Sequence, residues 1–421
     1  ITRYWRPVFE ADRSIDFKTA AGELLDLLDD AVDAQRVADV PLGAFLSGGV
    51  DSSAIVRAMA IKGGAVRTCT IGFDDPRLDE RAEARRTADR YQTTHVEETA
   101  TIEAASLIDR IAGVYGEPFA DSSALPTYLV CGAARRHVTV ALSGDGGDEI
   151  FGGYRRYRMF AAEERFRRAL PLGARRSVFG TLGRVYPKLD WAPRPFRFKT
   201  TFQALGEDGL SAYARAVSAV LPDRAGAMLS GDFAGALDGY DPVSLIAGRM
   251  DAGLDPVSTA QAIDLDTWLP GRMLTKVDRA SMAHGLEVRA PFLDHRLAEW
   301  TFRLPAEFRA TPAEGKRILK AALAPRIDAD ILHAQKRGFA PPVEGWLRAS
   351  EGPVRRLADS RRWRDSGVLE ARAVERMIAK HASGAANYAQ ELWTVIMFDA
   401  FLSAEAAARG TSSAAARLAA Q

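Results

Sequence analysis

Seven consecutive residues, Ser47 to Ser53, combine glycines, hydroxyls and one carboxylate in the order Ser-Gly-Gly-Val-Asp-Ser-Ser. The apolar run at 40–46 before them predicts a short buried strand, and residues 54–61 after them start a helix. In such a loop the backbone N–H groups and the positive end of the helix dipole face one spot. We therefore predict a binding site for a phosphate or pyrophosphate there.

Asp51 is the unusual member of this loop, because a carboxylate repels a phosphate unless a cation lies between them. It therefore predicts a Mg²⁺ ion that bridges the phosphates, while Ser47, Ser52 and Ser53 add hydroxyl donors. The loop lacks the GxxxxGK[ST] pattern of the other common phosphate loop. The alternative is a Ser/Gly turn in which a serine caps the helix. The full seven-residue pattern after a buried strand favours the phosphate site.

A second loop, 143–149, reads Ser-Gly-Asp-Gly-Gly-Asp-Glu and follows the apolar run 138–142. In an open parallel sheet, ligands bind beyond the carboxyl ends of the strands. Both loops occupy such ends, so we expect them to face one crevice, to which the second loop adds three carboxylates. The alternative is a glycine-rich acidic turn or an incidental cation site.

Strands and helices alternate through the first part of the chain, which predicts an α/β fold with a doubly wound parallel sheet. The expected strands are 40–46, 67–73, 95–97 and 138–142, and the expected helices are 17–37, 54–61, 78–91, 102–115 and 125–136.

After residue 154 helical periodicity dominates, with proline-rich loops at 193–195 and 341–342. We divide the chain into four parts. Residues 1–16 are expected to be a linker from an N-terminal domain that is missing here, and 17–154 form an α/β core. Residues 155–402 form a mainly helical remainder, and 403–421 form a flexible tail.

The composition argues against partners that need a strong electrostatic field. Lys and Arg number 56 against 55 Asp and Glu in 421 residues, so nucleic acid and membrane are not expected partners. The Arg-rich stretch 155–199 is interpreted as solvated faces rather than an RNA platform. The two cysteines, Cys69 and Cys131, form no CxxC pair. No apolar run is long enough to span a bilayer, and no signal peptide is evident. We expect a cytoplasmic protein without disulfides.

The first loop resembles the SGGxDSS signature of the N-type ATP pyrophosphatases, whose fold is of the adenine nucleotide alpha hydrolase type. The run 143–154, SGDGGDEIFGGY, is similar to the asparagine synthetase B group of that superfamily. Further matches to the C-terminal synthetase part of that family lie at 274–283, 287–295 and 336–339, in family order. The family matches are spread from residue 4 to about 350. The run Gly116–Ser123 and the Arg-rich middle of the chain resemble the bacterial branch found in exosortase-associated exopolysaccharide gene clusters.

This resemblance implies ATP and Mg²⁺ as cofactors and a role for each matching residue. Asp51 and Asp148 would coordinate the metal. Lys336, an unremarkable lysine by spacing alone, would reach the α-phosphate or the acyl-adenylate carbonyl, and Asp145 would take a proton from ammonia. ATP would be bound by Phe45, Leu46, Ser47, Gly48, Gly49, Asp51, Ser52, Ser53, Ile71, Ser143 and Gly144. We interpret four other residues of the matching runs as an internal ion-pair network, namely Asp278, Arg279, Glu287 and Arg289.

This sequence departs from the family's pattern at two places, and both bear on the identity of the substrate. Asp145 stands where many family members have Glu, and the run Ser122–Pro126 replaces an Arg-Ala-Ser-Thr-Pro run. The resemblance implies an ATP-dependent amide ligase that activates a carboxylate, that of the aspartate side chain first, as an acyl-adenylate for attack by ammonia. The alternatives are another acceptor, such as an exopolysaccharide component, or an inactive ATP-binding scaffold. The family's glutaminase domain is absent from this chain, and a homodimer is left open.

Overall fold

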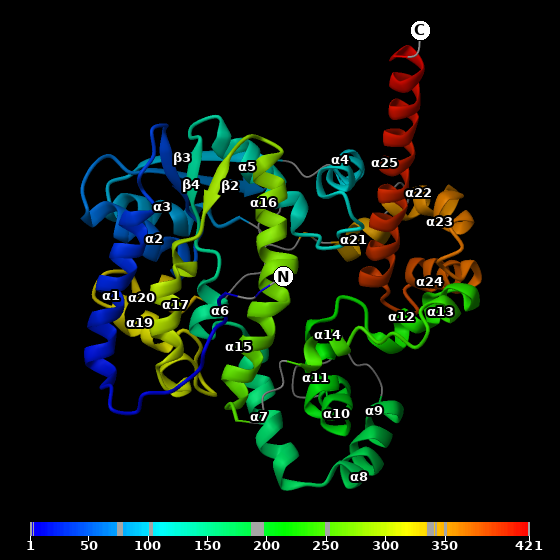
Figure 1. The fold of residues 1–421 in the computed structure, drawn as a ribbon, viewed down its shortest axis with the longest axis horizontal. Coiled ribbons are helices and arrows are strands. Elements are labelled where there is room, and N and C mark those ends of the chain that lie inside the picture. The colour runs from blue at the N-terminus through cyan, green and yellow to red at the C-terminus, as the bar shows by residue number, and fades with distance from the viewer. Residues whose placement is uncertain are drawn as a thin grey trace.

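Five parallel strands form the sheet of this protein, in the order β3-β2-β1-β4-β5 (Figure 1). The computed structural model describes residues 2, 4–73, 79–100, 104–186, 198–248, 253–334, 341, 343–348 and 352–419. The strands are β1 (Leu42–Phe45), β2 (Arg67–Phe73), β3 (Thr94–Ala100), β4 (Val140–Leu142) and β5 (Glu287–Arg289). The predicted α/β fold with a doubly wound parallel sheet is confirmed.

Alternate strand residues face two separate cores, as the two-residue period of a strand requires. Ala44 and Leu142 join one core, while their neighbours Phe45 and Ala141 join the other. The first core lies against α1, α2, α17 and α19, and the second against α4, α5, α16 and α25. Helices from both halves of the chain therefore cover both faces of the sheet.

The helices that alternate with the strands match the predicted segments closely. They are α1 (Phe17–Ala34), α2 (Val50–Ile61), α3 (Arg81–Arg90), α4 (Ala104–Tyr115) and α5 (Ala124–Arg135). A short further helix, α6 (Gly147–Phe151), forms within the second loop and was not predicted.

The rest of the chain is mainly helical, as expected. Its elements are α7 (Arg155–Ala169), α8 (Leu172–Arg175), η1 (Arg176–Gly180), α9 (Thr181–Val185), α10 (Lys199–Gly206), α11 (Gly209–Val217), α12 (Pro222–Met228), α13 (Gly231–Ala236), α14 (Ser244–Ala247), α15 (Pro256–Asp266), η3 (Leu269–Leu274), α16 (Thr275–Met282), η4 (Pro291–Leu293), α17 (His295–Phe302), α18 (Ala306–Arg309), α19 (Arg317–Leu323), α20 (Ala329–Leu332), α21 (Val343–Arg348), α22 (Pro353–Asp359), α23 (Arg362–Asp365), α24 (Ala371–Ala382) and α25 (Ala389–Ala419).

One strand was missing from the sequence-based expectation. β5 lies within the stretch assigned to helices, and it pairs in parallel with β4 through the Ala141–Val288 register. Three residues are too few for a two-residue period to be recognised against a helical background. The helical remainder thus supplies the edge strand beside β4.

Burial explains why α1 forms where it does. Asp16 caps the helix by accepting a hydrogen bond from the Thr19 N–H at 2.9 Å. Leu24, Leu28 and Val32 repeat at helical spacing and are fully buried. Each such side chain contributes roughly 1.5–3 kcal/mol by leaving water.

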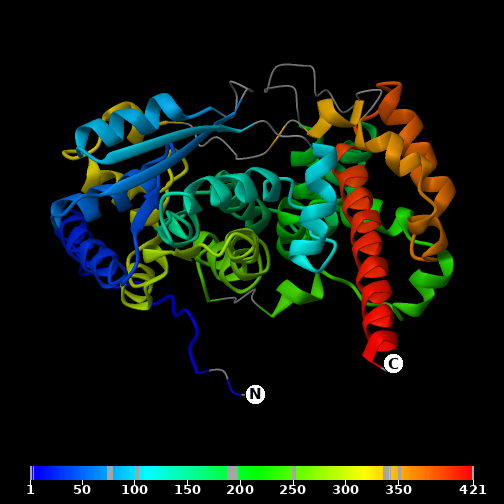
Figure 2. The same cartoon turned by 90° about the horizontal axis from the view of Figure 1, so that it is seen from above.

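The chain ends flank these layers. The predicted linker lies along α17, where Phe9 contacts Phe302 with ring centroids 4.4 Å apart. The stretch from residue 403, expected as a flexible tail, continues α25 to Ala419. Figure 2 shows α25 beside α4, at the opposite end of the molecule from α1. The domain boundaries themselves stay a prediction.

Two further expectations can be compared with the structure, and a third lies mostly outside the described residues. Both cysteines are buried and free. Within the described residues, no helix is long and apolar enough to cross a membrane. The proline-rich loop 193–195 lies outside the described residues, as does Pro342 of the loop 341–342.

The expected ion-pair network of the helical half forms only in part. Arg289 Nε lies 2.6 Å from Glu287 Oε1. Asp278 and Arg279 are exposed, and neither makes an ion pair with any residue that the structure describes.

Candidate functional site

The two loops meet at the point where the strand order reverses. β1 and β4 are neighbours in the sheet, and the chain continues from β1 to β2 on one side and from β4 to β5 on the other. A doubly wound sheet opens a crevice at such a point, beyond the carboxyl ends of the two strands. Ser47–Ser53 follows β1 and Ser143–Glu149 follows β4, so the fold places both loops there.

Glycines let the two loops approach each other closely. A Cβ on Gly144 would lie 2.9 Å from both the Asp51 Cβ and the Ser52 backbone nitrogen. A Cβ on Gly147 would lie 2.8 Å from Asp51 Oδ1. The second loop therefore packs directly on the first, around Asp51.

The first loop is shaped by its own serines. Ser47 N–H donates to Ser52 Oγ at 3.1 Å, and Gly49 N–H donates to Ser47 Oγ at 3.2 Å. The two hydroxyl oxygens are 3.0 Å apart. Gly49 is the N-cap of α2, so the loop runs into the positive end of that helix.

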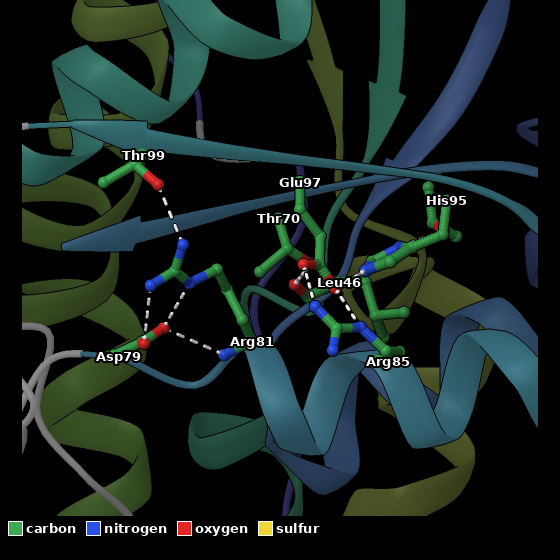
Figure 3. Close-up of polar contacts among 9 residues, drawn as sticks. Leu46, Thr70, Asp79, Arg81, Arg85, His95, Glu97 and Thr99 are labelled. Atoms are coloured by element: carbon green, nitrogen blue, oxygen red, sulfur yellow. Dashed lines mark hydrogen bonds and ion pairs between the residues drawn. The ribbon is translucent and has the colours of Figure 1, made fainter.

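Helix α3 supports the loop from the side. Glu80 Oε2 accepts a hydrogen bond from the Gly48 N–H at 3.2 Å. One of the N–H groups expected to bind a phosphate is therefore already bonded to a carboxylate. Figure 3 shows how the start of α3 is fixed: the Arg81 guanidinium bonds to Asp79 and donates to Thr99 on β3 at 2.8 Å. A Cβ on Gly72 would overlap the Arg81 side chain, so this arginine fits only because β2 has a glycine there.

The other expected ATP-binding residues of β1 and β2 lie at or near this edge. Leu46 O accepts the Thr70 hydroxyl at 2.5 Å (Figure 3), and Leu46 N–H donates to Cys69 O. Phe45 ends β1, and Ile71 is buried within β2. Ser53 is fully buried and its hydroxyl lies 3.2 Å from Thr87 Oγ1 on α3, so that hydroxyl is engaged away from the loop.

Lys316, which sequence reasoning missed, joins the two predicted metal ligands. Its Nζ lies 2.5 Å from Asp51 Oδ2 and 2.7 Å from Asp148 Oδ1, and the lysine is 6% exposed. One buried ammonium thus compensates two carboxylates from different loops. The residue lies 265 positions from Asp51 in the chain, and no spacing pattern links them.

The backbone at Lys316 is adapted to this position. Lys316 has a φ of +57°, a left-handed conformation that few side chains adopt. Its N–H donates to Phe151 O at 3.1 Å, at the end of α6. A Cβ on Gly315 would lie 2.6 Å from Gly152 O, so a glycine is required where this segment crosses the second loop.

The residues present fit a Mg²⁺ ion bound together with phosphates. Asp51 Oδ1 is buried and has no hydrogen-bond partner among the described residues. Within that same part of the chain no cluster of three His, Cys, Asp or Glu could hold a metal alone. Mg²⁺ is typically held by one or two carboxylates, substrate phosphates and water. Asp51 and Asp148 would supply the two carboxylates.

Two further acids belong to the second loop. Ser143 Oγ donates to Asp145 Oδ2 at 2.8 Å, which orients the predicted base. Glu149 is almost fully buried and accepts the Tyr154 hydroxyl at 2.8 Å. Burial raises the pKa of Glu149 to about 7, against the Tyr154 hydrogen bond that lowers it.

Lys336, the predicted contact of the α-phosphate, lies outside the described residues.

The fold and the site together define a protein with an α/β nucleotide-binding fold, in which paired phosphate-type loops meet at the switch point of the sheet. The sequence model of the asparagine synthase family matches residues 23–403. The chain belongs to the asparagine synthase family.

Several named proteins are similar to this chain. A Mycobacterium tuberculosis protein, provisionally named a glutamine-hydrolysing asparagine synthetase, is 35% identical over 94% of this chain and 60% of its own length. Asparagine synthetase (glutamine-hydrolysing) 1 of Bacillus subtilis is 27% identical over 89% of this chain and 58% of its own length. An amidase of Gibberella zeae is 26% identical over 75% of this chain. The chain spans about three fifths of the first two relatives.

Proposed function

We propose that this protein is an ATP-dependent amide ligase that converts the side-chain carboxylate of aspartate into an amide, with AMP and pyrophosphate as the other products. Membership of the asparagine synthase family supports ATP-dependent amidation. The observation that carries the proposal is the convergence of Asp51, Asp148 and Lys316 between the two loops at the switch point.

The first loop binds the pyrophosphate part of ATP in this proposal. Ser47, Gly48 and Gly49 offer donors at the start of α2, and Ser52 holds the loop in shape. Phe45, Leu46, Ile71, Ser143 and Gly144 bind adenine and ribose at the strand ends. Glu80 releases Gly48 N–H when a phosphate takes its place.

The second loop and Lys336 act on the reacting groups. A carboxylate oxygen of the acceptor bonds to the α-phosphorus while the α–β P–O bond breaks and pyrophosphate leaves. Ammonia then bonds to the acyl carbon, a proton passes to Asp145, and AMP leaves. Asp51 and Asp148 would hold Mg²⁺, which would supply positive charge against the leaving pyrophosphate. Lys336 neutralises the charge at the α-phosphate.

The test is pyrophosphate release from Mg-ATP and an ammonium salt, with and without L-aspartate, with products identified by mass. We expect aspartate-dependent release together with AMP and asparagine. Asp51→Asn should lower the rate on the order of 100-fold or more, because charge in the transition state loses its compensation. Asp26→Asn, at an exposed position of α1, is the control. ATP cleavage to ADP and phosphate, or cleavage that ignores every carboxylate, would overturn the proposal.

A further inference from the structure

A second cluster of charged side chains lies where α5 begins and η3 runs into α16. Arg272 Nε donates to Asp121 Oδ2 at 2.9 Å, and Lys276 Nζ lies 3.2 Å from Ser123 Oγ. Asp121 is 9% exposed and Lys276 is 7% exposed. Two cations and one carboxylate are thus gathered in a mostly buried place.

The cations of this cluster exceed what the carboxylate compensates. Within the described residues no carboxylate oxygen lies within 4 Å of Lys276 Nζ, whose other contact is Met273 Sδ at 3.9 Å. A buried ammonium without an anion at contact is costly. Burial raises the pKa of Asp121, but Lys276 and Arg272 bring it down to about 2, so this carboxylate is ionised at neutral pH. The cluster has a net positive charge and can accept one more anionic group.

Aromatic rings connect the cluster to the second loop. The Arg272 guanidinium lies 4.2 Å from the Trp268 ring centroid, and the Trp268 and Tyr154 rings are 6.3 Å apart. Tyr154 in turn donates to Glu149 of the second loop at 2.8 Å. Packed rings and one hydrogen bond therefore connect the cluster to Glu149 of the second loop.

The local backbone also marks this place. η3 is a π-helix of six residues, Leu269–Leu274, and it carries Arg272 one turn before Lys276. π-Helical turns are rare and occur frequently at functional sites. The run 122–126 at the start of α5 contains no basic residue, and the structure brings Arg272 and Lys276 from η3 and α16 against it.

We propose that this cluster binds the remote end of an α-amino acid acceptor, with Arg272 and Lys276 on its α-carboxylate and Asp121 on its α-ammonium group. The inference rests on the proposed function, and it assigns the residues that recognise the α-carboxylate and the α-ammonium group of the acceptor. The Arg272–Asp121 ion pair opens when the zwitterion binds, because each partner then gains an opposite charge on the ligand. The alternative acceptor, an exopolysaccharide component such as a uronic acid, carries no ammonium group. It would therefore offer Asp121 no cation to bind.

The first arm of the test compares Arg272→Gln with Arg279→Gln in the pyrophosphate-release assay. Arg272→Gln should raise the KM for L-aspartate about tenfold or more, because a charge-assisted hydrogen bond is lost. The kcat and the KM for Mg-ATP should change little, and Arg272→Lys should recover part of the loss. Arg279 is exposed on α16 and makes no ion pair within the described chain, so its variant should behave as wild type. An unchanged KM for L-aspartate in Arg272→Gln would overturn the inference.

The second arm uses Asp121→Asn and compares L-aspartate with succinate, which lacks the ammonium group. The wild-type preference for L-aspartate should fall about tenfold in the variant, with thermal unfolding as the check on folding. A purely structural role for Asp121 would lower both activities equally and leave the preference unchanged, which contradicts the inference.

A third arm separates this inference from the proposed function. If galacturonate but not L-aspartate drives pyrophosphate release, and Arg272→Gln leaves that activity unchanged, the inference fails while ligation stands. If no carboxylate drives release, L-aspartate is titrated by calorimetry into wild-type protein that holds Mg²⁺ and α,β-methylene ATP. Binding that Arg272→Gln loses supports the inference although the proposed function has failed. If L-aspartate does not bind at all, the inference is overturned as well.

Discussion

At the scale of single residues, Lys316 occupies the place between Asp51 and Asp148 where a Mg²⁺ ion would also lie. Lys316→Met keeps the length of the side chain and leaves the buried Asp148 and the half-buried Asp51 without their cation. We expect it to destabilise the metal-free protein by about 3 kcal/mol or more. Mg²⁺ alone should then raise the Tm more in the variant than in wild type.

The matched control is Lys320→Met, which removes an ion pair with Glu314, 3.0 Å long, on the same helix. Thermal unfolding in EDTA and in excess Mg²⁺ measures both variants. An equal Mg²⁺-induced shift in all three proteins would contradict the assignment of Asp51 and Asp148 as metal ligands.

Glu149 gives a prediction about pH. Its pKa of about 7 in the folded protein exceeds the ordinary value of 4.5, so the folded state binds its proton more tightly. Its contribution to stability is present below pH 4.5 and is lost as the pH rises through 7. Glu149→Gln removes this dependence and can still accept the Tyr154 hydroxyl.

Urea unfolding at pH 5 and pH 8 measures the effect. The free energy of unfolding of Glu149→Gln relative to wild type should rise by a few kcal/mol between these pH values. A difference that is the same at both would show that Glu149 ionises normally.

The candidate site residues that could be picked out from the sequence are those that lie next to one another in the chain. The loop from Ser47 to Ser53 could be identified because its glycines, hydroxyls and carboxylate are contiguous. Lys316 and Glu80 could not, because their roles depend on contacts between distant segments. Arg272 was likewise hidden, since its partner Asp121 lies 151 positions away.

At the scale of elements, the approach of the second loop to the first depends on Gly144. Gly144→Ala places a Cβ 2.9 Å from the Ser52 backbone nitrogen, which has no flexible end to move aside. We expect the loops to separate, with Mg-ATP binding weakened about tenfold or more and the helical content retained.

Gly113→Ala serves as the control for this substitution. Gly113 lies within α4, and an added Cβ meets no atom within 4 Å. It should stabilise the fold by up to about 1 kcal/mol, because alanine is the better helix former. Isothermal titration with Mg-ATP and circular dichroism measure both variants; unchanged ATP affinity in Gly144→Ala would contradict the close packing of the loops.

The predicted elements were accurate where a pattern spans enough residues. β2 and α4 agree closely with their expected ranges, because each is supported by a run of periodic or β-branched residues. β5 was missed, since its three residues, Glu287–Arg289, form a strand only by pairing with β4. Its edge position is set by tertiary contacts rather than by local preference.

At the scale of the whole molecule, the alternation of strands and helices was sufficient to predict a parallel sheet with both loops beyond the ends of its strands. It could not predict that α17 and α19 return to cover the face of the sheet beside α1. That return carries Lys316 into the crevice, and α16 carries Lys276 to the start of α5. The second half of the chain therefore completes the site that the first half begins.

The central claim, activation of a carboxylate as an acyl-adenylate between the two loops, is tested most directly by isotope transfer. L-Aspartate labelled with ¹⁸O in its side-chain carboxylate is incubated with Mg-ATP, an ammonium salt and the protein, and the AMP is examined by mass spectrometry. We expect AMP that carries one ¹⁸O atom, since the carboxylate oxygen bonded to the α-phosphorus leaves with it. Turnover that yields asparagine with unlabelled AMP, or with ADP, would contradict it.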